Sequence, residues 1–341
     1  MNPILDWGIH FIAGVQTSVP WLKEPAWFFS LLGTEEFYRY VLPFLYWCVD
    51  FRLAMRVGVI LMVSDSLNVF FKFAFHQPRP FWVSGRVRAF AAEGSYGLPS
   101  GHAQQAMTFW GTIATGINGW LRWLMAALIF LIGYSRIILA VHFPTDVLAG
   151  WLIGALILWA FLKWEAVVFA WFNRFTLAQK IGLAFAASMV LLTISMIGLA
   201  FVPPADPPQW EITAARALSL APGQSAIHPR DTTHILGVAG TFFGLAAGAI
   251  LIFKRGGFST RGPWWKRVLC FVLGMIGATI LSLGLRIVLP RDASFASQVL
   301  RYMRYALTGF WVSYAAPWVF IKLGLQNAPK VPKQPAPGLE V

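Results

Sequence analysis

Residues 144–165 read PTDVLAGWLIGALILWAFLKWE, and this stretch decides the fold class. Its charged residues lie only at its two ends, with Asp146 in the first turn and Lys163 and Glu165 in the last. A helix that crosses the hydrocarbon core of a bilayer needs about 20 predominantly apolar residues, and proline is favoured at the first helical position. The stretch therefore predicts a transmembrane helix that begins at Pro144.

Similar apolar runs recur along most of the chain. Of the 341 residues, 57% are hydrophobic and only 12% are charged, which is well below the charge content of a typical soluble domain. We expect an all-α, polytopic integral membrane bundle of about nine transmembrane helices, at residues 27–49, 53–75, 101–118, 121–141, 144–165, 178–203, 233–254, 265–288 and 302–325.

The same pattern predicts the organisation of the chain. Residues 1–26 form an interfacial N-terminal segment, 27–203 a membrane core, 204–232 a loop on the outer or luminal face, 233–325 three additional transmembrane helices, and 326–341 a disordered tail rich in proline. The stretch PPADPPQWEITAARALSL at 203–220 is either an amphipathic cap on the membrane surface or a plain connector.

The distribution of positive charge predicts the orientation. The loop KRGGFSTRGPWWKR at 254–267 carries five Lys and Arg residues, and such loops face the cytoplasm. With nine spans, the N-terminus lies outside and the C-terminus inside. Loops 76–100, 141–143, 203–232 and 289–301 then share the extracytoplasmic (periplasmic or luminal) face, where their residues can form one site.

The overall charge and the cysteines exclude several classes of protein. The net charge is +13, but no basic stretch has aromatic residues interleaved on a polar surface, so we expect no nucleic-acid partner. Anionic lipid head groups or an anionic substrate explain the charge better. Cys48 and Cys270 both lie in apolar segments, which supports neither a disulfide framework nor a zinc site.

Polar residues of the kind that a bilayer excludes occur first in KFAFHQPRP (72–80) and YGLPSGHA (96–103). Lys72 closes one span, and Arg79 follows between two prolines that hold the chain extended. Ser100 is the expected N-cap of the next helix, with Gly101 and His102 as its first residues. Free N–H groups at such a helix start attract an anion, and a glycine lets a ligand approach the backbone.

A third polar segment, SRIILAVHFPTD, occupies residues 135–146. Arg136 ends a span, and His142 lies just before the helix that begins at Pro144. Asp146 lies four residues after His142 and can reach back to its ring. A carboxylate on one ring nitrogen fixes the tautomer and leaves the other nitrogen free as a nucleophile or base.

Together the segments offer two histidines, three cations and two helix N-termini, without the carboxylate or cysteine cluster that a metal site needs. Concentrated positive charge of this kind favours phosphoryl transfer, in which stabilisation of the phosphoryl oxygens is most of the catalytic work. We therefore expect no metal and no cofactor.

The patterns K-x6-R-P, P-S-G-H and S-R-x5-H-x3-D resemble, in this order, the three signature motifs of the type 2 phosphatidate phosphatase and haloperoxidase superfamily. The resemblance implies that Lys72, Arg79, Ser100, Gly101 and Arg136 hold the phosphate. It further implies that His142 attacks phosphorus, Asp146 orients His142, and His102 protonates the leaving oxygen, with a phosphohistidine intermediate that water hydrolyses.

The resemblance leaves the substrate open. DWGI (6–9), DSLNVFFKFAFHQPRPFW (65–82) and HPRDTTHILGVAGTFFGLA (228–246) are similar to stretches of the nine-span glucose-6-phosphatases, whereas Asp146 resembles the wider lipid-phosphatase pattern. We expect a phosphorylated lipid (phosphatidate, phosphatidylglycerol phosphate, polyprenyl diphosphate or a sphingoid phosphate), with a sugar phosphate as the alternative. A lipid phosphotransferase and a transporter or flippase on the same scaffold are further alternatives.

Several residues near the motifs are secondary candidates. Asp65 and Asn68 share a helix face with Lys72 at i, i+3 and i+7, so they either tune this cation or hold two spans together. Pro80 and Trp82 flank Arg79, and Trp82 lines either an acyl groove or an interfacial aromatic belt. His76, His228 and His234 are interpreted as hydrogen-bonded loop histidines, with a lid edge as the alternative.

Overall fold

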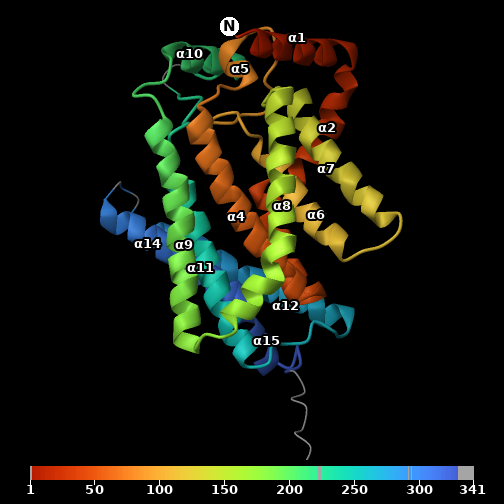
Figure 1. Ribbon diagram of the computed structural model, residues 1–341, viewed down its shortest axis with the longest axis vertical. Helices are drawn as coiled ribbons and strands as arrows, with labels where there is room; N and C mark the ends of the chain where they lie inside the picture. Colours follow the sequence, from red (N-terminus) through yellow and green to blue (C-terminus); the bar gives the residue numbers. More distant parts are fainter. Residues whose placement is uncertain (1, 222–223, 291, 293, 329–341) are drawn as a thin grey trace, which may run out of the picture.

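The protein is seen here as a computed structural model that describes residues 2–221, 224–290, 292 and 294–328. Long helices run side by side along its longest axis, and α1, α5 and α10 lie across one end (Figure 1). The described part is all-helical, as predicted, and has no strand beyond an isolated bridge between Ser259 and Asn327. The two sequence segments that form this bridge lie at the end opposite to α1.

The helix bounds follow the chain order. The α-helices are α1 (Pro3–Ser18), α2 (Lys23–Leu31), α3 (Glu35–Phe44), α4 (Phe51–Phe75), α5 (Pro80–Val83), α6 (Gly101–Thr115), α7 (Leu121–Ile138), α8 (Pro144–Phe172), α9 (Leu177–Ile197), α10 (Pro208–Ala217), α11 (Thr233–Lys254), α12 (Trp264–Thr279), α13 (Leu285–Val288), α14 (Phe295–Phe310) and α15 (Ala316–Lys322). Short 3-10 turns occur at η1 (Pro20–Leu22) and η3 (Gly198–Phe201), and π-helical turns at η2 (Leu45–Val49), η4 (Ile280–Gly284) and η5 (Trp311–Ala315).

Six helical stretches of the described chain are long and apolar enough to cross a membrane. They are Phe51–Val83, Leu121–Ile138, Pro144–Phe172, Leu177–Phe201, Thr233–Lys254 and Trp264–Val288. Each coincides with a predicted span, so the protein is a multi-pass integral membrane protein.

The other three predicted spans have a different form. The predicted span 27–49 is divided by a turn at residues 32–34, after which the Thr34 side chain caps α3 by accepting from Phe37 N at 3.2 Å. The span 101–118 is shorter, because α6 ends at Thr115. The span 302–325 lies in the continuous helix α14–η5–α15, whose first part carries Arg301 and Arg304. The total of nine spans therefore stays a prediction.

The first helix has the amphipathic character expected of an interfacial segment. Ile9 and Ile12 of α1 are fully buried, whereas Trp7 and Phe11 point outward with 53% and 39% of their surface exposed. Helices of this kind lie in the plane of the membrane surface with their apolar face in the head-group region. The helix ends at Ser18 and α2 begins at Lys23, so the predicted interfacial segment 1–26 is not one continuous helix.

Helices α6 and α8 approach at backbone distance because α8 carries glycines at positions 150 and 154. A Cβ atom at Gly150 would lie 2.6 Å from the Ser100 carbonyl oxygen, and one at Gly154 would lie 2.8 Å from that of Gln104. Small residues four apart allow this close packing between helices in membranes. The Ser100 amide consequently donates to the Asp146 carbonyl at 2.9 Å, which fixes the starts of both helices against each other.

Three of the predicted outer loops converge at one end of the bundle. Arg79 Nη1 donates to the Val141 carbonyl at 2.8 Å, and the His228 amide donates to the Gly94 carbonyl at 3.0 Å. The loop 289–301 does not join them. Tyr302 of α14 contacts Ser188 in the middle of α9 at 2.8 Å, so α14 begins partway along the bundle (Figure 1).

The predicted disordered tail begins too early at residue 326. Gln326 is only 7% exposed, and its side-chain amide donates to the Trp47 carbonyl at 2.8 Å. Asn327 accepts from Ser259 N at 3.1 Å. Gln326 and Asn327 are thus bonded to the bundle, and residues 329–341 lie outside the described part of the chain.

The α6–α8 contact can be tested with Gly150→Ala. The new methyl group would collide with the Ser100 carbonyl and force the helices apart, and such overpacking typically costs about 1–3 kcal/mol. We expect a lower Tm of the detergent-purified protein and reduced activity. Gly182→Ala in α9 is the matched control, because a Cβ there has no neighbour within 4 Å. Equal Tm values for the two variants would contradict the close contact.

Candidate active site

The motif residues meet where α4 and α7 end and α6 and α8 begin. From these elements and the loop 76–100, the chain brings together the eight predicted site residues: Lys72, Arg79, Ser100, Gly101, His102, Arg136, His142 and Asp146. Most of these side chains are inaccessible to solvent, with Arg79 and His142 each 1% exposed and Asp146 0%. The group forms an enclosed cluster with a concentrated positive charge.

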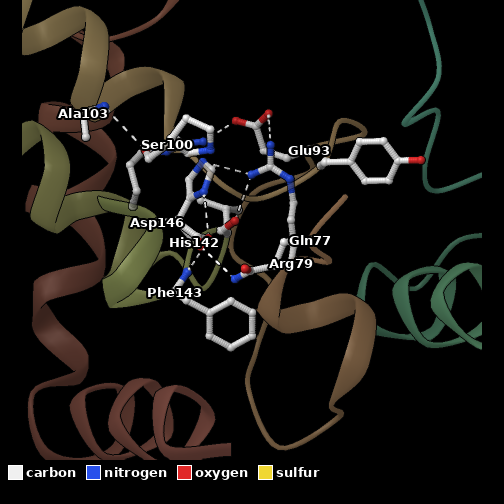
Figure 2. Close-up of polar contacts among 12 residues, drawn as sticks. Gln77, Arg79, Glu93, Ser100, Ala103, His142, Phe143 and Asp146 are labelled. Atoms are coloured by element: carbon white, nitrogen blue, oxygen red, sulfur yellow. Dashed lines mark hydrogen bonds and ion pairs between the residues drawn. The ribbon is translucent and has the colours of Figure 1, made fainter. Parts of the chain in front are cut away.

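His142 lies between Asp146 and Arg79 (Figure 2). Its Nδ1 is 3.3 Å from Asp146 Oδ2, and its Nε2 is 3.1 Å from Arg79 Nη1. A guanidinium has no acceptor, so the Nε2 atom that faces it carries the lone pair. The proton therefore resides on Nδ1 and is donated to Asp146.

The Asp146 carboxylate is held in place by further donors. Its Oδ2 accepts from Phe143 N at 2.9 Å, and its Oδ1 accepts from Gln77 Nε2 at 3.1 Å. Pro144 provides the first turn of α8, so this carboxylate also caps the helix start. The carboxylate has an orientation fixed by three contacts, and it in turn fixes the imidazole ring.

His142 is neutral in this environment. Burial, assisted by the positive charges of Arg79 and Lys72, holds the pKa of His142 well below its usual range. A neutral imidazole with a free Nε2 lone pair is the form that can act as a nucleophile.

Arg79 is clamped by the backbone around it. Its Nε donates to the Ser95 carbonyl at 2.6 Å, and its Nη1 to the Val141 carbonyl at 2.8 Å. Ser95 Oγ lies 3.0 Å from Arg79 Nη2 and also accepts from Lys72 Nζ at 2.8 Å. Lys72 makes a second bond to the Tyr96 carbonyl at 2.9 Å. The loop 76–100 thus supplies the oxygens that hold both cations.

Arg136 meets a residue that the sequence analysis missed. Its two terminal nitrogens donate to Ser30 Oγ and Glu93 Oε1, while its buried Nε has no hydrogen-bond partner within the described residues. Burial raises the pKa of Glu93, but Arg136 and Arg79 outweigh this effect and hold the pKa well below its usual range. Glu93 is the only acidic residue in the loop 76–100, which also contains three arginines. A single carboxylate among these cations was the feature of the sequence that could have identified Glu93.

The start of α6 has the predicted cap. Ser100 is the N-cap residue, and its Oγ accepts from Ala103 N at 3.4 Å. We expected open space for a ligand beside Gly101. The structure leaves none there, because a Cβ atom at this position would lie 3.2 Å from Asn68 Oδ1. His102 lies against Gly33, and its Nε2 is buried without a hydrogen-bond partner in the part of the chain that the structure describes.

Asp65 and Asn68 connect spans and do not contact Lys72. Asn68 Nδ2 donates to the Pro99 carbonyl at 3.3 Å and to Gln104 Oε1 at 2.9 Å. Asp65 pairs with His234 of α11 at 2.6 Å and accepts from Gln105 Nε2 at 2.6 Å. These contacts fit the alternative in which Asp65 and Asn68 hold spans together.

Pro80 begins the short helix α5, and Trp82 beside it is fully buried. The Trp82 ring lies 6.4 Å from that of Tyr96 and 5.9 Å from that of Trp210 in α10. Trp82 therefore belongs to a closed aromatic cluster, and neither an open acyl groove nor a surface belt is formed there. The segment 203–220 covers the site. Part of this segment faces outward, since Ile212 is 44% exposed.

Asp206 holds this covering segment in place through three contacts. It accepts from Arg230 Nε at 2.8 Å and from the Tyr96 hydroxyl at 2.8 Å, and it lies 2.6 Å from His76 Nε2. Burial raises the pKa of Asp206, but these three partners outweigh it and lower the pKa. The stabilisation is therefore present above the unfolded-state pKa of about 3.9 and is lost only as the pH falls below it. His76 and His234 are hydrogen-bonded, as predicted.

The motif residues lie within a segment of the chain that matches a known protein family. The model of the PAP2 superfamily matches residues 53–170, and that of the PAP2 superfamily phosphatase transmembrane extension matches residues 236–329. Glucose-6-phosphatase 3 of Bos taurus is 24% identical over 97% of this chain and 99% of its own length. No solved structure matches the chain significantly.

Two further relatives are similar over the motif region. Undecaprenyl-diphosphatase of Sulfolobus acidocaldarius is 31% identical over 31% of this chain and 53% of its own length. Sphingosine-1-phosphate phosphatase 2 of Mus musculus is 31% identical over 38% of this chain and 39% of its own length. The fold and site define a membrane-bound phosphoric ester hydrolase. The chain carries a PAP2 superfamily domain at residues 53–170, followed by a PAP2 transmembrane extension at residues 236–329.

The fastening role of Asp206 can be tested with Asp206→Asn. Loss of the charge weakens its contacts with Arg230 and His76, and breaking a partly buried network of this kind costs about 1–3 kcal/mol. We expect faster tryptic cleavage after Arg216 and a lower Tm. Asp231→Asn is the control, because the contacts of that carboxylate are local ones with Thr233. Equal cleavage rates in both variants would show that Asp206 does not fasten the cover.

Proposed function

We propose that the protein removes phosphate from a phosphorylated lipid through a phosphohistidine intermediate on His142, without a metal ion. The observation that carries this proposal is the orientation of His142, whose protonated Nδ1 faces Asp146 and whose Nε2 lone pair faces the cationic cluster. A phosphoryl group bound by those cations would lie in front of the nucleophilic nitrogen.

In the first step, His142 Nε2 attacks phosphorus and the bond between phosphorus and the ester oxygen breaks. His102 enters this step as an imidazolium beside the bound phosphate anion and gives its proton to the leaving oxygen. Asp146 stabilises the positive charge that develops on the His142 ring. Lys72, Arg79 and Arg136 neutralise the phosphoryl oxygens. The Ser100 hydroxyl and the Gly101 amide at the start of α6 are the further donors, since the Ser100 amide already donates to the Asp146 carbonyl.

In the second step, water attacks the phosphohistidine. His102, now deprotonated, takes a proton from this water, the bond between phosphorus and Nε2 breaks, and inorganic phosphate leaves. Both histidines then return to their starting protonation states. In both steps, side chains of the protein balance the negative charge on the transferred phosphoryl group.

Two observations support a lipid substrate. The site lies at one end of the bundle beside α1, whose exposed Trp7 and Phe11 suit the head-group region. Asp146 contacts His142 as expected from the resemblance to lipid-phosphate phosphatases. Phosphatidate, phosphatidylglycerol phosphate, polyprenyl diphosphate and sphingoid phosphates are the candidate substrates.

A sugar phosphate is the second candidate, and one observation favours it. Glucose-6-phosphatase 3 of Bos taurus aligns with nearly the whole chain, including the three C-terminal spans, whereas the lipid-phosphatase relatives align with the motif region. On this alternative the same eight residues act on a soluble ester, with the enclosed polar site as the binding pocket.

We also propose that the active site faces the extracytoplasmic side, with the N-terminus outside and the C-terminus in the cytoplasm. The basic loop 254–267 follows the end of α11 that lies away from the site, which supports this orientation. The proposed division is the one stated above, with residues 27–203 as the phosphatase core and 233–325 as an extension.

The proposal is tested by phosphate release from a panel of lipid and sugar phosphates, with EDTA present. We expect the native protein to hydrolyse a lipid phosphate and His142→Ala to lose at least about 10³-fold in kcat, because no other group can replace the nucleophile. His10→Ala is the control, since that side chain is 57% exposed on α1. Loss of native activity in EDTA, or survival of activity in His142→Ala, would refute the mechanism, and preference for glucose 6-phosphate would select the second candidate.

Asp146→Asn tests the orienting role of the carboxylate. The substitution leaves the shape but removes the charge that holds the proton on Nδ1, so we expect kcat to fall by roughly 10²–10⁴-fold with a small change in KM. Retention of radiolabelled phosphate on the quenched enzyme separates the steps, and slower labelling is the expected result. A change confined to KM would contradict the assignment.

A further inference from the structure

The loop 76–100 places one carboxylate inside the cationic cluster. Glu93 Oε1 bonds to Arg136 Nη2, and Glu93 Oε2 lies 3.6 Å from Arg79 Nη2 (Figure 2). The two guanidiniums belong to separate segments, one at the end of α7 and one before α5. A single anion therefore bridges the two arginines that the proposed function assigns to the phosphoryl group.

The surroundings of this carboxylate contain donors that it leaves unused. Arg136 is 3% exposed, and its buried Nε has no hydrogen-bond partner among the residues that the structure describes. His102 Nε2 is likewise buried and unpartnered in this part of the molecule, and it is a further donor when it carries a proton. A buried donor without a partner costs about 1–3 kcal/mol, so the cluster is arranged for an anion with more acceptor oxygens than a carboxylate has.

We infer that the Glu93 carboxylate occupies the place of the phosphoryl group in the ligand-free enzyme and must leave it before a phosphate can bind. This inference rests on the proposed function, because it takes Arg79 and Arg136 as phosphate ligands. Glu93 is thus an internal competitor. It satisfies the guanidiniums while the site is empty and is displaced by a ligand with greater charge and three free oxygens.

The loop can release this side chain without unfolding. The next residue, Gly94, is anchored by the bond from His228 N to its carbonyl at 3.0 Å, so the backbone beside Glu93 is held. The Glu93 side chain is 27% exposed, which gives it a route to water by rotation about its own bonds. Displacement therefore requires a change of rotamer, and the anchored backbone returns the carboxylate when the phosphate departs.

An internal competitor has two consequences for the reaction. It weakens the binding of every anion by the same factor, because each must first break the contacts of Glu93. It also helps to expel the product, since inorganic phosphate competes with a carboxylate that is always present at high effective concentration. A ligand with a single carboxylate gains little when it replaces Glu93. A phosphate dianion brings one more negative charge and more acceptor oxygens than the carboxylate that it replaces.

The test compares phosphate binding by the full-length native protein and Glu93→Gln in detergent. Inorganic phosphate and orthovanadate are titrated while the Tm is followed, and KM is measured for the best substrate. We expect Glu93→Gln to bind both anions at least about 10-fold more tightly than the native protein, with a lower Tm without ligand and a larger rise on saturation. KM should fall in parallel.

Glu165→Gln is the matched control. Glu165 forms a two-bond ion pair with Arg56, at 2.7 and 2.8 Å, away from the site, so its neutralisation should leave anion binding unchanged. Phosphate binding by Glu93→Gln that is unchanged or weaker would overturn the inference and make Glu93 a residue that positions the arginines for phosphate. If Glu93→Gln does not fold, Glu93→Asp, with a shorter reach, should show tighter binding by a smaller factor, and unchanged binding would again overturn it.

The same titration separates this inference from the proposed function. Binding of inorganic phosphate needs no turnover, so it is repeated in His142→Ala and in the double variant with Glu93→Gln. Tighter binding in the double variant supports the inference even if the native enzyme hydrolyses no tested ester. Equal binding in the two variants overturns the inference even if phosphate release and the phosphohistidine are both established.

Discussion

Burial of positive charge at one end of the bundle is the constraint on which the rest of this structure depends. Lys72, Arg79 and Arg136 lie within or beside apolar helices, where an uncompensated charge is costly. Their compensation comes from the loop 76–100, through the Ser95 and Tyr96 carbonyls, the Ser95 hydroxyl and the Glu93 carboxylate. The irregular path of this loop follows from that requirement, because a regular helix would have used its carbonyls internally.

The cover over the site is a second consequence of the same constraint. Electrostatic interactions are strong only where water is excluded, and here α10 and the aromatic rings of Trp82, Tyr96 and Trp210 provide the exclusion. Asp206 ties this cover to Tyr96, whose carbonyl holds Lys72. Residues more than one hundred positions apart in the sequence therefore contribute to the position of Lys72.

The sequence alone was sufficient for the parts of the fold and site that depend on local patterns. Apolar length predicted six spans that the helices match, and the cap at Ser100 followed from residue type. The His142–Asp146 contact followed from helical spacing. Spacing could not reveal Glu93 or Asp206, because both act through irregular loops whose path depends on tertiary contacts. The division of residues 27–49 at Gly33 was equally hidden, since a short turn scarcely alters the apolar content of the segment.

The close contact of α6 with α8 at Gly150 and Gly154 has a consequence for a protein whose solvent is a bilayer. Helices in membranes tilt and shift as the thickness of the surrounding lipid changes. At Gly150 and Gly154 the backbone of α8 lies directly against the Ser100 and Gln104 carbonyls, with the side chains of Ala103 and Met107 beside the contact. The close contact and the bond from Ser100 N to the Asp146 carbonyl therefore leave the starts of α6 and α8 little freedom to separate when the lipid deforms the bundle.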